Sequence, residues 1–303
     1  MKLSSSVYQL LLWAFKNVPF QNRWAHLLRR LPIRLDRYYK DLHFKGVSLV
    51  QSKSGSFKIN HDGSRIGNQI FWKGLQNSFE ADTIWMWETL CNGSDVILDI
   101  GANVGIYSLI AKSENPNAKI IAFEPSRKIY PELIVNMDLN NFDIKCERIA
   151  LSNSNKEQTF FDSTLEQFPT SGSLSAAKLK DRTSNLDEIL EYTVVCTTLD
   201  DYVVNNNVRR IDLIKIDIEL HEPELFEGFK RLQEFRPTII VEVLNQDVGD
   251  KIAAASNLKG YHIYRLVAPY KLEKMDSITA HTVHRNVLLL PEEKQLPDNT
   301  AII

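Results

Sequence analysis

The stretch "VILDIGANVGIYSLIA", from Val96 to Ala111, decides the fold of this 303-residue chain. An apolar strand runs through Asp99, and helical spacing begins soon after the turn that follows. Gly101 and Gly105 allow the backbone to turn sharply and to approach a ligand closely. Asn103 stands where a dinucleotide-binding loop normally has its second glycine. The stretch therefore predicts a strand, a tight turn and a helix that hold a small molecule.

Further strand patterns follow this stretch along the chain. The segments "AKIIAFEP", "IDLIKIDI" and "PTIIVEVL" are largely apolar, and helical patterns separate them. Such alternation predicts a parallel sheet that helices cover on both faces. Two last strands, "YHIYRLV" and "TVHRNVLLL", look antiparallel. We predict an α/β, Rossmann-like domain over residues 79–303, with a mostly parallel sheet and a C-terminal antiparallel strand. Residues 1–78 are expected to form an N-terminal extension of helices and short strands.

The whole chain is nearly neutral, with 36 Lys and Arg against 38 Asp and Glu, but its N-terminus is basic. Residues 1–46 contain nine Lys or Arg, two Asp and no Glu, so they carry +7 and the remainder carries −9. A pI near 6.4 argues against nucleic acid as a partner. The basic head could contact a membrane surface, an anionic acceptor or a second copy of the chain as a homodimer. No apolar run approaches the roughly 20 residues of a membrane span, so we expect a cytoplasmic protein, peripheral to the inner face of the membrane if the head binds lipid.

The turn and the next strand indicate which ligand is bound. Ligands of such sheets lie beyond the carboxyl ends of the strands, where the strand order switches. Glu124 ends the second strand 19 residues after Gly105, where a carboxylate can accept both hydroxyls of a ribose. NAD enzymes share these features, so a nicotinamide oxidoreductase remains an alternative. Asp99 and Asn103 add polar side chains to the turn, and the Asp99 carboxylate opposes a phosphate but suits ammonium and sulfonium groups. The turn therefore favours S-adenosylmethionine as the cofactor.

An acid-rich segment, "KIDIELHE", ends the fourth strand at the expected mouth of the site. Strand alternation would place Asp217 and Glu219 on one face. Methyl transfer to an alcohol needs an aligned acceptor oxygen and a group that takes its proton. We predict Glu219 as the base, and His221 is the second candidate. Asp217 would lie nearer the positive groups of the cofactor, and Glu242, at the end of the fifth strand, would hold an acceptor hydroxyl. Glu222 completes the predicted catalytic group.

These side chains also have structural interpretations. Acids in the first turn of a helix interact favourably with the helix dipole, which would explain Glu222. A lone histidine such as His221 is often structural. Three acids can also bind a divalent metal, but their spacing fits a dedicated oxygen-ligand site poorly. We therefore predict no metal.

The same residues carry a resemblance to a known family. "LDIGANVGIYSLIA", "IAFEPS", the asparagine pair in "NMDLNN", "TTLDDY" and "IDLIKIDIELHEPEL" with "PTIIVEVL" resemble the FkbM-type methyltransferases, in order, from about Glu80 to Glu242. The resemblance implies a class I methyltransferase fold of the Rossmann-like type, S-adenosylmethionine as methyl donor, and O-methylation, often of a sugar or glycan. With it, the predicted cofactor-binding residues are Glu80, Asp99, Gly101, Asn103, Gly105, Glu124, Pro125, Ser126 and Ala150.

Two segments qualify this prediction. The family usually has a glycine where this chain has Leu220, so a cofactor-binding relative without catalysis is a further alternative. Residues 162–191 form the most polar and least periodic stretch, and we expect a long surface loop that covers the acceptor as a lid. The acceptor is expected to be a small molecule or a glycan, which a lipid can carry.

Overall fold

A computed structural model describes residues 5–30, 42–43, 45–61, 65–78, 80–163, 172–174, 189–298 and 300–303. In this part of the chain, the central sheet has nine strands in the order β5-β4-β3-β10-β11-β14-β12-β13-β15. Its parallel part consists of β5 (Ile144–Glu147), β4 (Lys119–Phe123), β3 (Val96–Ile100), β10 (Leu213–Ile216) and β11 (Thr238–Glu242). β14 (Asn286–Pro291), β12 (Tyr261–Ala268) and β13 (Lys271–Met275) continue the sheet antiparallel, and β15 (Ala301–Ile302) pairs in parallel with β13.

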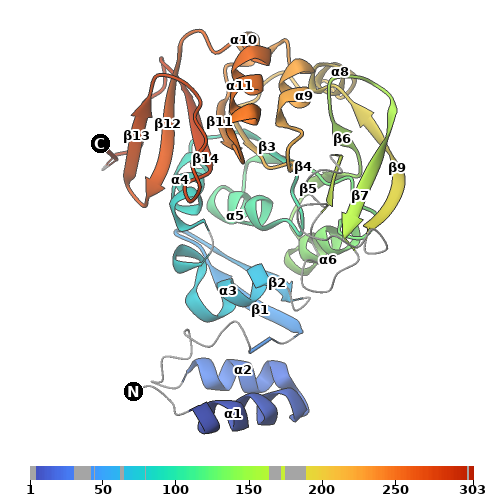
Figure 1. The fold of residues 1–303 in the computed structure, drawn as a ribbon, viewed down its shortest axis with the longest axis vertical. Helices are drawn as coiled ribbons and strands as arrows, with labels where there is room; N and C mark the ends of the chain where they lie inside the picture. The colour runs from blue at the N-terminus through green and yellow to red at the C-terminus, as the bar shows by residue number, and fades with distance from the viewer. Residues whose placement is uncertain are drawn as a thin grey trace.

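The strand order reverses beside β3. From β3 the chain moves outward through β4 to β5, and it later returns to the other side of β3 to form β10. Such a switch leaves a crevice beyond the carboxyl ends of the two strands. The α/β Rossmann-like fold is thus confirmed. The antiparallel end is larger than predicted, because "KLEKM" forms β13 and pairs with β12 (Figure 1).

Helices cover both faces of the parallel strands (Figure 1). One face packs against α4 (Ala81–Cys91), α5 (Ile106–Glu114) and α6 (Tyr130–Asn140), with strand residues such as Ile97 and Ile240 in its core. The other face packs against α8 (Leu199–Asn205), α9 (Glu222–Glu227), α10 (Leu232–Phe235) and α11 (Gln246–Ala255), with Leu98 and Ile239 in its core. Successive side chains of a strand point to opposite faces, so each apolar strand contributes to two cores.

The N-terminal extension adds layers at one end of the molecule (Figure 1). β1 (Gly46–Gln51) pairs with β2 (Ser56–His61), and α3 (Arg65–Lys73) and the 3-10 turn η2 (Leu75–Asn77) lead towards α4. Asn140 of α6 fixes β2 in place, because its side chain accepts from the Lys58 N–H at 2.6 Å and donates to the Lys58 carbonyl at 2.8 Å. Phe57, Ile59 and Ile70 share a core with α4–α6. The boundary between residues 78 and 79 stays a prediction.

Two helices, α1 (Ser5–Asn17) and α2 (Gln21–Arg29), form the outermost layer. Phe15 and Ala25 pack in a small core with Phe71 and Trp72. Several large side chains described on this layer are nevertheless exposed: Leu10, Trp13, Phe20, Trp24 and Leu27. Among the described residues, no helix has the length and apolarity needed to cross a membrane. The partner of this face stays a prediction.

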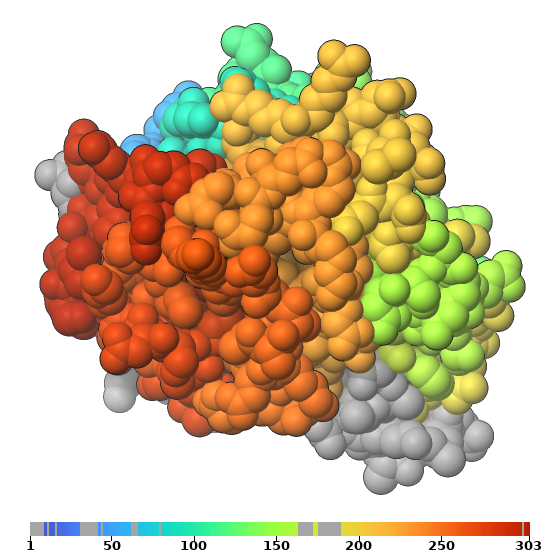
Figure 2. Space-filling view, turned by 90° about the horizontal axis from the view of Figure 1, so that it is seen from above, coloured from blue at the N-terminus to red at the C-terminus, as the bar shows by residue number. Residues whose placement is uncertain are grey.

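A second, smaller sheet lies after β5 in the chain. It has the order β6-β9-β7-β8 and contains β6 (Ala150–Leu151), β7 (Glu157–Ser163), β8 (Gly172–Ser173) and β9 (Ile189–Thr197). The expected loop over residues 162–191 is wrong at both ends, since Asp162 and Ser163 pair with Leu190 and Ile189 in the β7–β9 ladder. From above, the green and yellow segments of the chain lie beside the orange helices (Figure 2). Residues 164–171 and 175–188 lie outside the described residues, so the lid stays a prediction.

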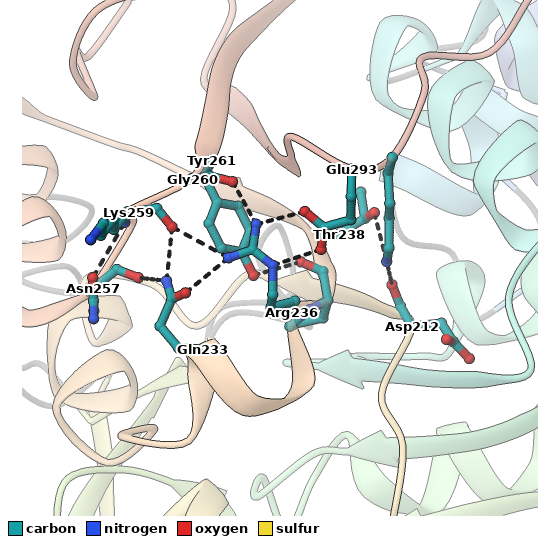
Figure 3. Close-up of polar contacts among 11 residues, drawn as sticks. Asp212, Gln233, Arg236, Thr238, Asn257, Lys259, Gly260, Tyr261 and Glu293 are labelled. Carbon is teal, nitrogen blue, oxygen red and sulfur yellow. Dashed lines mark hydrogen bonds and ion pairs between the residues drawn. The ribbon is translucent and has the colours of Figure 1, made fainter.

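Charged side chains tie chain segments together at the amino ends of the parallel strands (Figure 3). The Arg236 guanidinium donates to both carboxylate oxygens of Glu293 at 2.6 Å and to the Gly260 carbonyl at 2.7 Å. Lys294 donates to the Asp212 carbonyl at 3.1 Å and to the Thr238 hydroxyl at 3.3 Å. These contacts join β10, β11 and the segment after β14, so this edge of the sheet has a structural role.

Candidate active site

The turn after β3 is built from residues in the left-handed region of the backbone. Gly101 and Gly105 have φ of 83° and 90°. A Cβ on Gly101 would overlap the carbonyl oxygen of Asp217, so the turn packs directly against the end of β10. Asn103 has φ of 55°, and its side-chain oxygen accepts from the Val104 N–H at 2.9 Å. Asparagine enters this region more readily than most residues with a side chain, which explains how it replaces a glycine here.

Glu124 follows β4 directly and is only 4% exposed. One carboxylate oxygen accepts from the Asn103 N–H and the other from the Ser126 N–H, both at 2.9 Å. Burial raises the pKa of Glu124 to about 7, although these two hydrogen bonds act in the opposite direction. Each carboxylate oxygen can accept a second hydrogen bond. The carboxylate can therefore still receive the two hydroxyls of a ribose, and this role stays a prediction.

The strand that leads to the acid cluster ends earlier than predicted. β10 stops at Ile216, and Glu219 and Leu220 have φ of 56° and 75°. The expectation that strand alternation places Asp217 and Glu219 on one face is therefore wrong, because a left-handed turn replaces the strand. Leu220 occupies a conformation that favours glycine, and this costs a residue with a side chain about 1–2 kcal/mol. The departure from the family pattern is thus a strained position next to the site.

A group of charged side chains and one tyrosine, most of them buried, lies at this edge of the sheet. We call it the Lys215 cluster, and it consists of Glu80, Asp99, Tyr107, Lys215, Asp217 and Glu242. The Lys215 side chain has no exposed surface, and its Nζ lies 3.4 Å from Asp217 Oδ2 and 5.0 Å from the centre of the Tyr107 ring. The Tyr107 hydroxyl donates to Glu80 Oε2 at 2.5 Å. Asp99 lies opposite Lys215 in the β3–β10 register. Four separate chain segments thus bring carboxylates to one ammonium group.

Burial and mutual repulsion control the protonation of this cluster. Burial raises the pKa of Asp99 to about 6, against the hydrogen bond from Ser108, which is 2.6 Å long, and the charge of Lys215. Burial and the neighbouring carboxylates raise the pKa of Glu242 well above its ordinary value. Burial alone would lower the pKa of Lys215, but the four carboxylates together raise it. The lysine is therefore a permanent cation, and it lies beside Asp99, an acid whose pKa of about 6 is close to neutral.

His221 belongs to a different group of side chains. Its Nε2 lies 2.9 Å from the Ser152 hydroxyl, and its Nδ1 lies 3.6 Å from Glu224. Burial lowers the pKa of His221, and the charges that act on it are those of Glu224, Glu227 and Lys156. None of these residues is a member of the Lys215 cluster. The predicted catalytic role of His221 stays a prediction, and its described contacts are structural.

Glu222 begins α9 and is fully buried. One of its oxygens accepts from the Ile218 N–H at 3.2 Å, and the other has no hydrogen-bond partner among the described residues. Burial raises the pKa of Glu222 to about 8. Its position in the first helical turn agrees with the structural interpretation. With this pKa, however, the carboxyl holds a proton at neutral pH. It therefore lacks the negative charge by which an ionised acid interacts with the helix dipole.

The other predicted cofactor-binding residues lie just after β4 and in β6. The Ser126 hydroxyl donates to Asp162 at 2.8 Å and accepts from the Ile129 N–H at 3.1 Å, so it joins β7 to the start of α6. Pro125, between Glu124 and Ser126, is half-buried. Ala150 is a buried residue of β6 that pairs with Cys196 of β9. The cofactor-binding roles of these three residues stay predictions.

Sequence reasoning missed several residues at this edge. Lys215 stands out in the sequence, because a lysine interrupts the otherwise apolar strand "LIKI", and this signal could have found it. Tyr107, His284 and Arg285 carry no such local signal. His284 Nδ1 lies 3.3 Å from Asp82, and Arg285 Nη1 lies 3.9 Å from Glu242, so the loop before β14 reaches the same edge.

The arrangement suits a cationic ligand. The Gly101 turn allows close backbone approach, Glu124 can accept hydroxyls, and the carboxylates around Lys215 attract positive charge. A pyrophosphate would instead be repelled by the buried acids at the same edge. The residues present therefore fit the sulfonium, the ammonium and the ribose of S-adenosylmethionine.

Comparisons with known proteins identify the family. The family model "Methyltransferase FkbM domain" matches residues 99–263, more than half of the chain. The chain is 30% identical over 207 residues to methyltransferase sdnD of Sordaria araneosa, a match that covers 61% of this chain and 80% of sdnD. It is 24% identical over 172 residues to the hexuronic acid methyltransferase AglP of Haloferax volcanii, which covers 57% of this chain and 65% of AglP. It spans less than two thirds of the length of several curated relatives.

A solved S-adenosylmethionine-dependent methyltransferase of Agrobacterium tumefaciens is 11% identical to the chain, with a TM-score of 0.42, over 82% of this chain and 71% of that one. The family match and the geometry of the crevice agree on S-adenosylmethionine as the cofactor. The chain therefore belongs to the methyltransferases with an FkbM domain.

Proposed function

We propose that the chain transfers a methyl group from S-adenosylmethionine to a hydroxyl of a sugar or glycan-type acceptor. The observation that carries this proposal is the concentration of carboxylates at the carboxyl edge of the sheet, namely Asp217, Glu219 and Glu242. Carboxylates accept hydrogen bonds from several hydroxyls and can take a proton from an alcohol. An amine or a carboxylate acceptor would have less need of a general base than an alcohol. The relative AglP, named a hexuronic acid methyltransferase, supports a sugar as the acceptor.

In this proposal the cofactor is held where β3 and β10 end. S-adenosylmethionine supplies a methyl group bound to a positively charged sulfur. Glu124 accepts the ribose hydroxyls with the lone pairs that Asn103 and Ser126 leave available. Asp217 and Glu80 provide negative charge for the sulfonium and ammonium groups.

Glu219 is the proposed base for the acceptor hydroxyl. Its charge acts on both Glu222 and Glu242, so it belongs with the acids at this edge. The Ser173 hydroxyl donates to the Glu219 carbonyl oxygen at 2.6 Å and thereby supports the left-handed turn that carries the side chain. Glu242 would orient a second hydroxyl of the acceptor. This division of roles explains why a polyhydroxylated acceptor suits the site better than a simple alcohol.

Transfer of a labelled methyl group tests the proposal. Nucleotide sugars, glycolipid extracts and small alcohols form the acceptor panel, and label on nitrogen or on a carboxylate would contradict it. Glu219→Gln keeps the shape but removes the base, so turnover should fall by about 10²–10⁴ while cofactor affinity is retained. Glu227→Gln is the matched control, because Glu227 is exposed on α9 and accepts from Asn153. Normal turnover of Glu219→Gln would exclude Glu219 as the base and make His221 the next candidate.

Further measurements distinguish the two alternatives, a nicotinamide oxidoreductase and a relative that binds the cofactor without catalysis. Calorimetry that detects binding of NAD but not of S-adenosylmethionine would favour an oxidoreductase. A chain that binds S-adenosylmethionine and methylates nothing in the panel, but gains activity as Leu220→Gly, would show that the strained turn has cost this relative its catalysis.

The N-terminal helices suggest how the acceptor is presented to the site. We propose that α1 and α2 contact an anionic surface that carries a lipid-linked acceptor. Trp13 and Trp24 are 65% and 45% exposed, and residues 5–30 contain no acid. Tryptophan and arginine together suit the headgroup region of a bilayer. The double variant Trp13→Ala/Trp24→Ala should lose binding to anionic vesicles and keep its activity on a water-soluble acceptor. If the variant instead abolishes a dimer that the native chain forms without vesicles, the face meets a second copy.

A further inference from the structure

Lys215 places an ammonium group among the buried apolar side chains of β10. All four residues of β10 are buried, and the other three are leucine or isoleucine. An ammonium group is buried only when acids or hydrogen-bond acceptors compensate it. A hydrophobic residue of similar volume at such a position often gives an equally stable protein. Stability therefore does not explain a lysine here.

The contacts of Lys215 lead to two acids of the site. Its Nζ lies 3.4 Å from Asp217 Oδ2 and 3.4 Å from the Ile216 carbonyl oxygen. It also lies over the Tyr107 ring, whose hydroxyl donates to Glu80 at 2.5 Å. The Trp87 N–H donates to the Tyr107 carbonyl at 2.9 Å and holds this residue in place. The Lys215 ammonium thus contacts Asp217 directly, and it is connected to Glu80 through Tyr107.

The groups that face Lys215 come from every element around it. Glu80 precedes α4, Asp99 belongs to β3, Asp217 follows β10 and Glu242 ends β11, while Tyr107 of α5 offers its ring. The charge of Lys215 lowers the pKa of Glu80, Asp99 and Glu242, each of which burial raises. Without the cation, these acids would hold protons up to a higher pH.

We propose that Lys215 is a positioning residue for the cofactor: its buried ammonium compensates and orients the surrounding carboxylates, so that they receive the positive groups of S-adenosylmethionine. Because its side chain is fully buried, Lys215 acts through these carboxylates and makes no contact with the ligand. The inference rests on the cofactor of the proposed function, and it is independent of the acceptor.

The test compares the pH dependence of ligand binding in matched variants. Lys215→Met removes the charge and keeps the length of the side chain, while Lys215→Arg keeps the charge. Lys294→Met is the control, since Lys294 is a half-buried lysine at the opposite end of the same sheet, bonded to Asp212 and Thr238. Calorimetry measures the affinity for S-adenosylmethionine and for S-adenosylhomocysteine, which lacks the sulfonium charge. Thermal unfolding of each variant reports its folding.

S-adenosylmethionine affinity rises with pH as the acids of the site lose their protons. In Lys215→Met, the midpoint of this rise should move up by about 1–3 pH units, because Lys215 lowers the pKa of Glu80, Asp99 and Glu242 and a neighbouring opposite charge depresses a carboxyl pKa by about that amount. At neutral pH the affinity then falls about tenfold or more and returns at higher pH, and S-adenosylhomocysteine loses less. Lys215→Arg and Lys294→Met should keep the native pH profile. An unchanged profile in Lys215→Met, or an equal loss of both ligands at every pH, would overturn the proposal.

Tyr107→Phe keeps the proposal testable if Lys215→Met does not fold. This variant leaves the lysine in place but removes the hydroxyl that donates to Glu80, so a smaller upward shift of the same profile is expected. A folded Tyr107→Phe variant with the native profile would refute the part of the proposal in which the Tyr107 hydroxyl connects Lys215 to Glu80. All of these readouts measure binding alone. A chain that binds S-adenosylmethionine but methylates no hydroxyl would therefore refute the proposed function and leave the result for Lys215 intact.

Discussion

The two ends of β10 and β11 hold their charged residues in different ways. At the amino ends, ion pairs and hydrogen bonds near the surface involve Arg236, Glu293 and Lys294 (Figure 3). At the carboxyl ends, Lys215 and Glu242 are buried. The hydrogen bond from Arg236 lowers the pKa of Glu293 to about 2, so this acid is ionised at neutral pH. Burial instead raises the pKa of two acids at the carboxyl end, to about 7 for Glu124 and about 8 for Glu222.

The difference separates a structural edge from a functional one. At the amino end, the charged groups form hydrogen bonds and ion pairs that hold chain segments together. At the carboxyl end, buried acids sit next to the left-handed residues Asn103, Glu219 and Leu220, an arrangement that costs stability. Strain and shifted pKa values gather at functional sites because ligands make use of them. The same strands thus serve stability at one end and chemistry at the other.

The largest effect should come from a methyl group at the carboxyl edge. In Gly101→Ala the Cβ would overlap the Asp217 carbonyl at a φ of 83°, so we expect a loss of about 3 kcal/mol or more in the free energy of unfolding, together with loss of cofactor binding. Gly260→Ala is the counterpart at the amino edge. Its φ is 72°, but its nearest neighbour is the movable end of Arg236 at 3.1 Å, so about 1–2 kcal/mol is expected, with binding unchanged. Chemical denaturation and calorimetry measure both, and equal losses in the two variants would remove the distinction.

The pH dependence of stability should have opposite signs at the two edges. The Glu222 pKa is about 8 in the folded chain against an ordinary value of 4.5, so the folded state keeps a proton that the unfolded state loses. Its contribution is complete below about pH 4.5 and is lost as the pH rises through about 8, by at most about 1.4 kcal/mol per unit. Glu222→Gln should flatten this decline in denaturation curves recorded across that range.

Glu293 provides the opposite case. Its lowered pKa gives a contribution that is present above the ordinary value of 4.5 and is lost as the pH falls through about 2. Since its side chain is 52% exposed, solvent screening limits this contribution to about 1 kcal/mol or less. Glu293→Gln should therefore change stability only in the acid range. A decline between about pH 4.5 and 8 that is the same in both glutamine variants would contradict the assignment of Glu222.

The smallest effect concerns two residues with a side chain in the left-handed region. Leu220→Gly at the carboxyl edge should stabilise the chain by about 1 kcal/mol, because it relieves a φ of 75°. Arg236 at the amino edge has φ of 43°, yet Arg236→Gly should destabilise the chain, since it removes the bonds to Glu293 and Gly260. Denaturation midpoints decide both signs. If Leu220→Gly were destabilising, the leucine side chain would supply packing that outweighs the strain.

Much of the fold could be predicted because its signals are local. The glycine turn, the acid at the end of β4 and the alternation of strands and helices follow from backbone sterics and from hydrophobic periodicity within short windows. Asn103 could be singled out for the same reason, since its tolerance of a left-handed backbone is a property of asparagine itself. The extra strand β13 and the first residues of β9 were missed, because charged residues weaken the alternation of both segments.

The contents of the site were less predictable. Strand alternation failed at Glu219, because the left-handed turn begins where β10 ends. His221 looked like a partner of the acids in sequence, and the structure turns it towards Ser152 instead. Glu80 and Lys215 are 135 positions apart, and no local pattern connects them.

The amino-acid sequence alone was therefore enough for the order of the elements, the cofactor-binding turn and the family, because each depends on neighbours along the chain. Only the tertiary structure decided which charges share one buried volume and which are satisfied at the surface. The physical reason is that burial and the charges nearby set a pKa, and both depend on residues that folding brings together from distant parts of the chain.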